Sequence, residues 1–460
     1  MGSWHERAVI SDHDKGDARG ADGDQTPADA YARLEEATPE ERAAMTQQLI
    51  ADHPQGRLDL PARAGQGANL VGVALPGETL RKAHLPGANL HGANLSGAAL
   101  GQADLTNAVL EKADLHDADL AGATLRGAAL GEANLQGALL EEANLQDAGL
   151  RFANLRGAAL ESADLRRADL WGVTLDDADL AGADLTDAHL GESTLRGANF
   201  VGATLRGAAL GKADLTGARL SGADLRGADL GGATLREAKL DGAQLQEVDL
   251  STCDIAHIAL GGAQLSRTLL RRDGLGGAIG EEVAAAYNDA ATGYLALERN
   301  FADLGDLDAA RWAYGKKRRM QKRAVRAAAT AALEARQWGT AAGRVAAYVG
   351  DEAAEWLCDY GESVPRVLRA LVVAYLAFTL FYGVTGSVVR VTGDILHPVR
   401  LTTHNPLDLA VFSLASMTTQ TALGLQASDS VVQIPTGLET LIGIFLTGLL
   451  GFVTGNRIRR

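Results

Sequence analysis

Seven consecutive residues near the C-terminus could provide oxygen ligands for an ion. They are Thr418, Thr419, Gln420, Thr421, Ala422, Leu423 and Gly424. The hydroxyls and the amide of the first four of these residues could surround a partly hydrated ion, and no charged side chain lies between Asp408 and Asp429. Oxygen atoms in channel filters replace part of the hydration shell of the ion. The segment therefore predicts an ion-conducting loop, and the two aspartates predict a mild cation preference at its outer mouth. The alternative is that the loop is a closed plug that conducts no ions, and that this region only anchors the protein.

Glu439 follows this loop, near the start of the last apolar segment. An ionisable residue close to membrane depth is a functional candidate. It is interpreted either as a surface residue at a helix start or as a brace for the loop. Small residues then recur every four positions with Gly448 beside them, namely Gly443, Thr447, Gly451 and Gly455. This spacing favours close helix packing. A bend at Gly448 or Gly451 that opens a gate is the alternative.

A second group of candidates is basic. Seven positive charges fall within eleven residues, at Lys316, Lys317, Arg318, Arg319, Lys322, Arg323 and Arg326. They form either a solvated helix face or a contact with anionic lipid at the cytoplasmic membrane surface. The aromatic and apolar residues that follow, Tyr348, Trp356, Leu357 and Tyr360, stand among acids and predict an interfacial helix.

Helices must position the loop. The uncharged stretch between Arg369 and Arg390 and the one from Thr440 to Asn456 are near the length that crosses a bilayer. They predict spanning helices at 366–389 and 436–456. Between them, Asn405 and Pro406 predict the start of a helix at 406–418 that is too short to span. Irregular backbone such as the loop at 418–424 is tolerated at membrane depth only inside protein or beside water. The cationic ends of both spans predict cytoplasmic termini, although Arg390 and Arg400 count against this.

Three short motifs carry a resemblance for residues 366–460: Phe412-Ser413, Met417-Thr418-Thr419 and Leu438-Glu439-Thr440-Leu441-Ile442-Gly443. The region resembles the two-transmembrane, pore-loop ion channels of the potassium-channel superfamily, which implies four chains around one pore. It departs from that family in the filter, where Thr-Val-Gly-Tyr-Gly uses glycines to aim carbonyl groups at the ion. The departure predicts a pore that is weakly selective among monovalent cations and not potassium-selective.

A leucine recurs every five residues from Leu70 to Leu275, at 42 positions, and only Phe200 and Ile255 replace it. Alanine usually stands two residues earlier. A period of five fits neither an α-helix nor a strand and predicts a solenoid. The run resembles the pentapeptide-repeat family, which implies a right-handed quadrilateral β-helix over residues 58–277. The pattern weakens near Cys253, Ile258, Thr268 and Asp273.

The remaining segments predict connecting and capping elements. Residues 1–57 are predicted to form a disordered N-terminus and a helical cap, and the cap is expected to begin at Thr38-Pro39-Glu40-Glu41. Residues 278–363 read as a helical linker, and its hairpin around Gly305-Asp306 resembles a tetratricopeptide unit. The net charge of −15 argues against nucleic-acid binding, because phosphate binding needs a basic surface. No phosphate loop, nucleophile motif or metal-ligand pattern appears, so neither an enzyme nor a cofactor nor a metal site is expected.

Together these patterns predict a multidomain β and α membrane protein. It is expected to be a homotetrameric ion channel in the cytoplasmic (inner) membrane, with a β-helix that senses or docks an unknown cytoplasmic protein or ligand. The alternative is a pentapeptide-repeat scaffold tethered to the membrane, or a DNA mimic that binds a topoisomerase, without conductance. Residues 70–275 contain 28 acidic and 18 basic side chains. This excess of acids permits mimicry, but a soluble mimic has no use for spanning helices.

Overall fold

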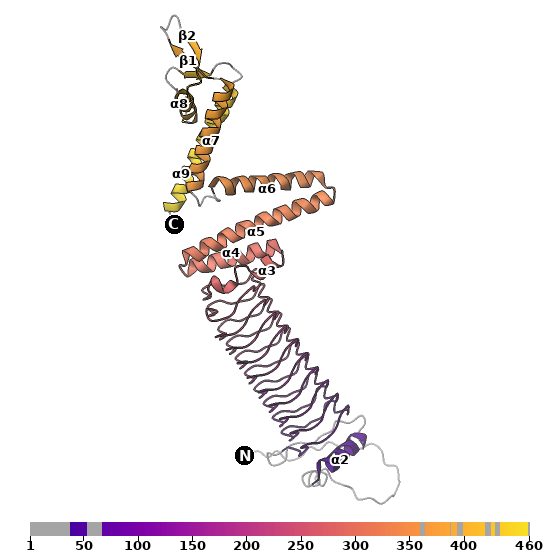
Figure 1. The fold of residues 1–460 in the computed structure, drawn as a ribbon. Coiled ribbons are helices and arrows are strands. Elements are labelled where there is room, and N and C mark those ends of the chain that lie inside the picture. The colour runs from indigo at the N-terminus through magenta and orange to yellow at the C-terminus, as the bar shows by residue number, and fades with distance from the viewer. Residues whose placement is uncertain are drawn as a thin grey trace, which may run out of the picture. The chain divides into compact units, whose positions relative to one another are not determined.

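The computed structural model describes residues 37–52, 67–358, 364–386, 388–392, 399–418, 425–427 and 433–458. The chain divides into two compact units, Met1–Met320 and Gln321–Arg460, and the boundary falls within helix α5 (Leu307–Glu334). Figure 1 shows the repeats in the N-terminal unit and the helices with a small sheet in the C-terminal unit. The predicted first repeats at 58–66 and the predicted loop residues 419–424 lie outside the described residues.

Each coil of the repeats takes twenty residues. Isolated parallel bridges pair a residue with the one twenty positions later, from Asn69↔Asn89 to Asp249↔Leu269. Four pentapeptides therefore make one coil. The leucine of each unit and the alanine two residues before it are almost completely buried, as at Leu165 and Ala163. The prediction that leucines fill the axis is confirmed, and these side chains leave no room for a substrate inside the coils.

The residue before each leucine shapes the next corner of the coil. Asp104 Oδ1 accepts the N–H of Thr106 at 3.1 Å, and the same contact recurs down the repeats. The second residue of each corner has a positive φ, for example 56° at Asn107 and 66° at Gly172. Glycine adopts this conformation without strain, and asparagine and aspartate tolerate it. The side-chain acceptor and the positive φ explain two preferences of the repeats: Asp or Asn directly before the leucine, and Gly two residues after it.

The ladder between coils is broken at one place, which we call the seam. Bridges recur every five residues along the repeats, except that Asp229 does not pair with Asp249. The thiol of Cys253 there donates to the carbonyl of Leu230 at 3.0 Å. Cys253 takes a position that a smaller alanine fills in most units, and the seam coincides with the place where the sequence pattern weakens. Stacked aspartates alone do not explain it, because Asp164 and Asp184 keep their bridge.

Helix α2 (Pro39–Asp52) covers the first coils. Thr38 and Glu41 form a capping box at its start, in which the Thr38 N–H donates to Glu41 Oε2 at 2.8 Å. Arg42 Nη1 donates to the carbonyl of Val71 in the first coil at 2.8 Å. The predicted helical cap is present.

The opposite end of the repeats is closed by the short helix η1 (Asp273–Leu275), α3 (Gly280–Val283) and α4 (Tyr287–Asp303). Glu281 Oε1 accepts the N–H of Leu260 at 2.6 Å. Asn300 accepts the N–H of Thr268 at 3.0 Å and donates to its carbonyl at 2.8 Å. The side chains of Glu281 and Asn300 thus pair with the backbone groups that a further coil would otherwise bind. The last coil therefore offers no free strand edge for another chain at these positions. Burial of Glu281 raises the pKa of its carboxyl to about 7.

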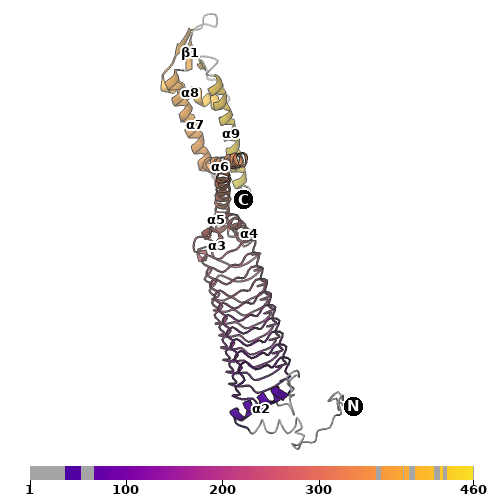
Figure 2. The ribbon, with the colours of Figure 1, turned by 90° about the vertical axis from the view of Figure 1, so that its right-hand side faces the viewer.

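The expected helical hairpin consists of α4 and α5 (Leu307–Glu334), with a turn at Gly305, whose φ is 79°. The C-terminal unit continues with α6 (Trp338–Cys358), α7 (Val364–Thr385), α8 (Pro406–Met417) and α9 (Gln433–Ile458). A three-stranded antiparallel sheet in the order β2-β1-β3 joins them, built from β1 (Val388–Thr392), β2 (Val399–Thr402) and β3 (Leu425–Ala427). Figure 2 shows α8 between the upper ends of α7 and α9. The sheet was not predicted.

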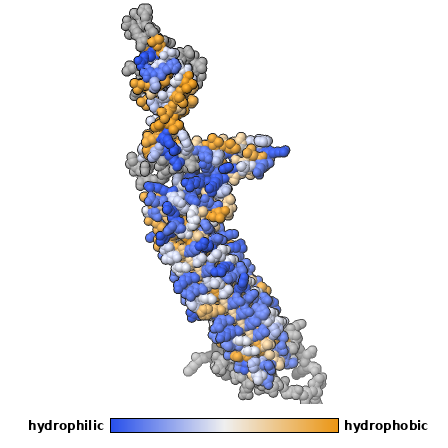
Figure 3. Space-filling model, in the orientation of Figure 1, coloured by the Kyte–Doolittle hydropathy of each residue, from blue (hydrophilic) through white to orange (hydrophobic). Residues whose placement is uncertain are grey.

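One helix among the described residues, α7, is long and apolar enough to cross a membrane. The apolar part of α9, Leu438–Gly451, and all of α8 are shorter. Large apolar side chains of α7 are exposed, including Leu380 at 68% and Val384 at 79%. Figure 3 shows hydrophobic residues gathered over α6, α7 and α9, whereas they alternate with hydrophilic ones along the repeats.

Candidate functional site

Glu439 lies where three helices of the C-terminal unit meet. Its side chain, on α9, is fully buried. Tyr382 of α7 donates its hydroxyl to one carboxylate oxygen at 2.7 Å, and Ser413 of α8 donates its hydroxyl to the other. The Tyr382 ring also packs edge-on against Phe412, with 5.2 Å between ring centroids. A buried carboxylate is costly unless hydrogen bonded, so Glu439 is not a surface residue, and it ties α8 to both long helices.

Helix α8 also approaches α9 through backbone. Thr440 donates its hydroxyl to the carbonyl of Ser416 at 2.9 Å. A Cβ added at Gly443 would lie 2.3 Å from the carbonyl oxygen of Met417. No real contact is that short, so only glycine allows this approach. The C-terminal end of α8 is therefore held directly against α9.

A second polar cluster fixes the start of α8. Asn405 caps the helix through a hydrogen bond that its Oδ1 accepts at 3.1 Å, and Pro406 occupies the first turn. Asp408 accepts the hydroxyl of Thr403 at 2.8 Å and forms an ion pair with Arg390 of β1. Since Asp408 is buried and paired, it supplies no free charge at a pore mouth, contrary to expectation. Asp429, the other residue expected there, lies outside the described residues.

Both ends of the predicted ion-conducting loop are anchored. On one side Thr418 caps α8, and its hydroxyl donates to the carbonyl of Leu414 at 2.9 Å. On the other side Leu425 of β3 pairs with Arg390 of β1. Since Arg390 also holds Asp408, the sheet connects the end of the loop to the start of α8.

The glycines of α9 have different surroundings. Gly443 packs on α8, whereas a Cβ added at Gly448 or Gly451 would meet nothing within 4 Å. These two positions form a bare surface on the isolated chain, open to a neighbouring helix. Their role as a gate or hinge stays a prediction.

The basic cluster on α5 is partly neutralised. Three of its lysines are mostly buried in ion pairs, Lys316 with Glu282 at 2.9 Å, Lys317 with Glu298 at 2.5 Å and Lys322 with Glu352 at 2.7 Å. The expectation of a lipid-facing cluster therefore does not fit these lysines. It remains a prediction for the exposed side chains of Arg319, Arg323 and Arg326.

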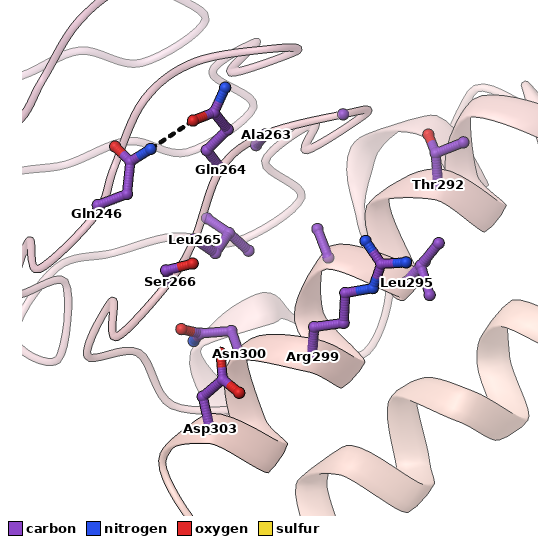
Figure 4. Close-up of a pocket in the computed structure, with 12 residues that line it drawn as sticks. Gln246, Ala263, Gln264, Leu265, Ser266, Thr292, Leu295, Arg299, Asn300 and Asp303 are labelled. Carbon is purple, nitrogen blue, oxygen red and sulfur yellow. Dashed lines mark hydrogen bonds between the residues drawn. The ribbon is translucent and has the colours of Figure 1, made fainter.

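A groove of about 350 Å³ lies between the last coils and α4. Figure 4 shows Gln246 and Gln264 on the coil side, joined by a 2.5 Å hydrogen bond, and Thr292 and Arg299 on the α4 side. The polar groups do not converge on one point, and we assign the groove no role.

Sequence reasoning found Glu439 and the ends of α8 but missed their partners. Tyr382 lies inside an apolar run, and nothing in the local sequence sets it apart from a lipid-facing aromatic residue. Arg390 gave a usable signal, because it lies in Val388–Thr392, where β-branched residues predominate as in a strand.

Comparisons with known proteins concern the repeats. The model of the family of pentapeptide repeats matches eight copies between residues 66 and 255. A comparison with curated proteins gives no match. Among solved structures, the chain is similar to HetL, a pentapeptide repeat protein involved in heterocyst differentiation regulation from the cyanobacterium Nostoc sp. strain PCC 7120. The identity is 36% over 46% of this chain and 94% of that chain, with a TM-score of 0.23.

Two further structures resemble parts of the chain. One is alr5209, a pentapeptide repeat protein from Nostoc PCC 7120, with 42% identity over 19% of this chain and 69% of that one and a TM-score of 0.18. The other is full-length QnrB1, a plasmid-mediated fluoroquinolone resistance protein, with 18% identity over 40% and 90% and a TM-score of 0.20. The eight matched copies place residues 66–255 in the pentapeptide-repeat family, and the twenty-residue coils agree with this.

Proposed function

We propose that four copies of this chain form a cation-permeable pore in the cytoplasmic membrane. The C-terminal unit is the pore, and the pentapeptide repeats serve as a cytoplasmic element that senses or docks a partner. The observation that carries this proposal is the clamped short helix. α8 is too short to cross a bilayer, yet the buried Glu439 holds it between two longer apolar helices.

This arrangement suits an ion path for an electrostatic reason. The last carbonyl groups of a helix carry a partial negative charge. α8 ends at Met417, directly before the loop of threonines and glutamine, so this charge lies beside the proposed path. A helix end of this kind stabilises a cation at membrane depth. Because Asp408 is paired with Arg390, the preference for cations rests on the helix end and on Asp429.

Four copies are proposed because one pair of helices encloses no pore, and closed symmetry supplies one. The C-terminal unit exposes apolar side chains that need lipid or another copy to cover them. On α7 and α9 they include Leu376, Leu380, Val384, Leu441, Ile444 and Phe445. Gly448 and Gly451 add the bare surface on which a neighbouring helix packs closely.

The test is current across a planar bilayer that contains the purified full-length protein. With sodium on one side and potassium on the other, we expect a reversal potential near zero, because the loop lacks the glycines of a potassium filter. A reversal potential near the potassium equilibrium value would overturn the selectivity. A stable monomer in detergent would remove the pore.

A matched pair of variants connects the current to the clamp. Glu439→Gln loses the charge that both hydroxyls satisfy, so it should lower the current. Glu334→Gln, on the exposed end of α5, should leave it unchanged. A tetramer without current under any stimulus would favour the membrane-tethered scaffold.

The DNA-mimic alternative has less support from the surface of the repeats. Arginines stand among the acids and pair with them, as in Asp164–Arg166 at 2.5 Å and Asp214–Arg196 at 2.6 Å. A phosphate mimic needs acids that remain unpaired along one face.

A further inference from the structure

An exposed apolar stripe runs along α6. Trp338, Val345, Val349 and Trp356 follow one another at intervals of seven, four and seven residues, which places them on one side of a helix. Their exposed fractions are 68%, 41%, 57% and 50%. At 1.5 Å per residue, the two tryptophans lie about 27 Å apart. A row of exposed large apolar side chains of this length marks an interaction site.

Helix α5 contacts α6 along one flank of this stripe. Lys322 of α5 forms an ion pair with Glu352 at 2.7 Å, and Tyr348 donates its hydroxyl to the same residue at 2.7 Å. Arg344 donates to the carbonyl of Ala328 at 2.7 Å. These polar residues bind α5, and the four apolar side chains stay exposed. Glu352, seven residues after Val345, lies on the stripe side as well, with its charge paired by Lys322.

The position of α6 along the chain indicates what covers the stripe. Five residues separate it from α7, and that connection spans at most about 21 Å. The guanidinium of Arg369, near the start of α7, lies 5.8 Å from the Trp356 ring centroid. Figures 1 and 2 show α6 running across the direction of α7. If α7 crosses the bilayer, α6 lies where α7 enters it.

We propose that α6 lies in the lipid–water interface, with its stripe inserted among headgroups and upper acyl chains. The inference rests on the proposed membrane crossing of α7. Tryptophan prefers this depth because its ring is apolar and its N–H group needs a polar partner. An interfacial helix buries its apolar face roughly 5–10 Å deep. Since the four stripe residues are uncharged and Glu352 beside them is paired with Lys322, zwitterionic lipid is sufficient, and added salt should not release the helix.

Quenching of tryptophan fluorescence by brominated phosphatidylcholine tests the proposal. The full-length protein is reconstituted in vesicles of phosphatidylcholine, with and without bromine on the acyl chains. Variants keep one of the five tryptophans and replace the others by phenylalanine. We expect Trp338 to lose most of its emission and Trp171, in the repeats, to lose none. Equal quenching at Trp338 and Trp171 would overturn the proposal.

Further variants distinguish insertion of α6 into the bilayer from insertion of α7, and they control for misfolding. Phe381→Trp, in a protein without other tryptophans, reports whether α7 enters the bilayer. If it is quenched while Trp338 is not, α7 enters the bilayer and α6 does not; if neither is quenched, both proposals fail.

With the other tryptophans kept, replacing Trp338 and Trp356 by phenylalanine should lower the quenched fraction. Val349→Glu should abolish quenching at Trp338, and Ala347→Glu, on the opposite side of the helix, should not. Equal effects of these two substitutions would also contradict the proposal.

Discussion

Replacing Glu281 by glutamine should remove a loss of stability that the end of the repeats undergoes as the pH rises. In the folded chain this buried carboxyl has a pKa of about 7, raised by burial above its ordinary value of 4.5. The folded state therefore binds the proton more tightly than the unfolded state. Its contribution to stability is present below pH 4.5 and is lost as the pH rises through 7. The loss across that interval is about 3 kcal/mol.

Glu281→Gln carries no charge at any pH and can still accept the N–H of Leu260. Its extra N–H group lacks a partner, which costs about 1–3 kcal/mol at every pH. The stability of the variant is therefore compared with that of the wild type at each pH. The informative quantity is how this difference in stability changes with pH. Between pH 5 and pH 8 this difference should move in favour of the variant by about 2.5 kcal/mol.

Amide hydrogen exchange in full-length protein measures this difference locally, in peptides that contain Leu260 and α4. Exchange protection reports the free energy of local opening once intrinsic rates at each pH are corrected. Glu111→Gln, at an exposed position of the repeats far from Leu260 and α4, serves as the control and should leave the exchange of these peptides unchanged. A flat profile for Glu281→Gln as well would show that the carboxyl does not titrate in this interval, and the reasoning would be refuted.

Three other changes test the packing. Ala163→Leu adds a side chain to the filled core of a middle coil and should destabilise the repeats by about 1–3 kcal/mol, measured by denaturation; unchanged stability would contradict the inward position of this alanine. Gly443→Ala should push α8 away from α9 and reduce tetramer yield in detergent, whereas Gly350→Ala, at an exposed position of α6 where an added Cβ meets nothing, serves as its matched control. Equal yields for these two variants would argue against the close approach of α8. Arg390→Ala leaves Asp408 buried without its cation and should lower the melting temperature of the protein, and adding Asp408→Asn should recover much of the loss. If the two substitutions are additive, their ion pair contributes nothing.

Much of the fold follows from local patterns in the sequence. The five-residue period defines the coils because each leucine must reach the axis, and a shift of one residue would expose the whole stack. Helix α8 is predictable for a similar reason, since Asn405 and Pro406 specify its start whatever surrounds it. Both features depend on neighbours in the chain, which a sequence displays directly.

The sheet and the partners of Glu439 depend on residues far apart in the chain. β3 begins 33 residues after β1 ends, and so short a strand carries little intrinsic preference. Tyr382 and Glu439 are 57 residues apart. The sequence shows one ionisable residue and several hydroxyls in apolar segments, but only the packing of three helices selects which hydroxyls meet the carboxylate.

The seam has a mechanical consequence. In a solenoid each coil contacts only its neighbours, so a load applied at one end passes through every interface in turn. The interface that lacks the bridge between Asp229 and Asp249 bears the same load with fewer hydrogen bonds than the others. A pull on the C-terminal end of the repeats should therefore open the coils there first. The last coil and its helical cap would detach while the leucine stack on the N-terminal side stays closed.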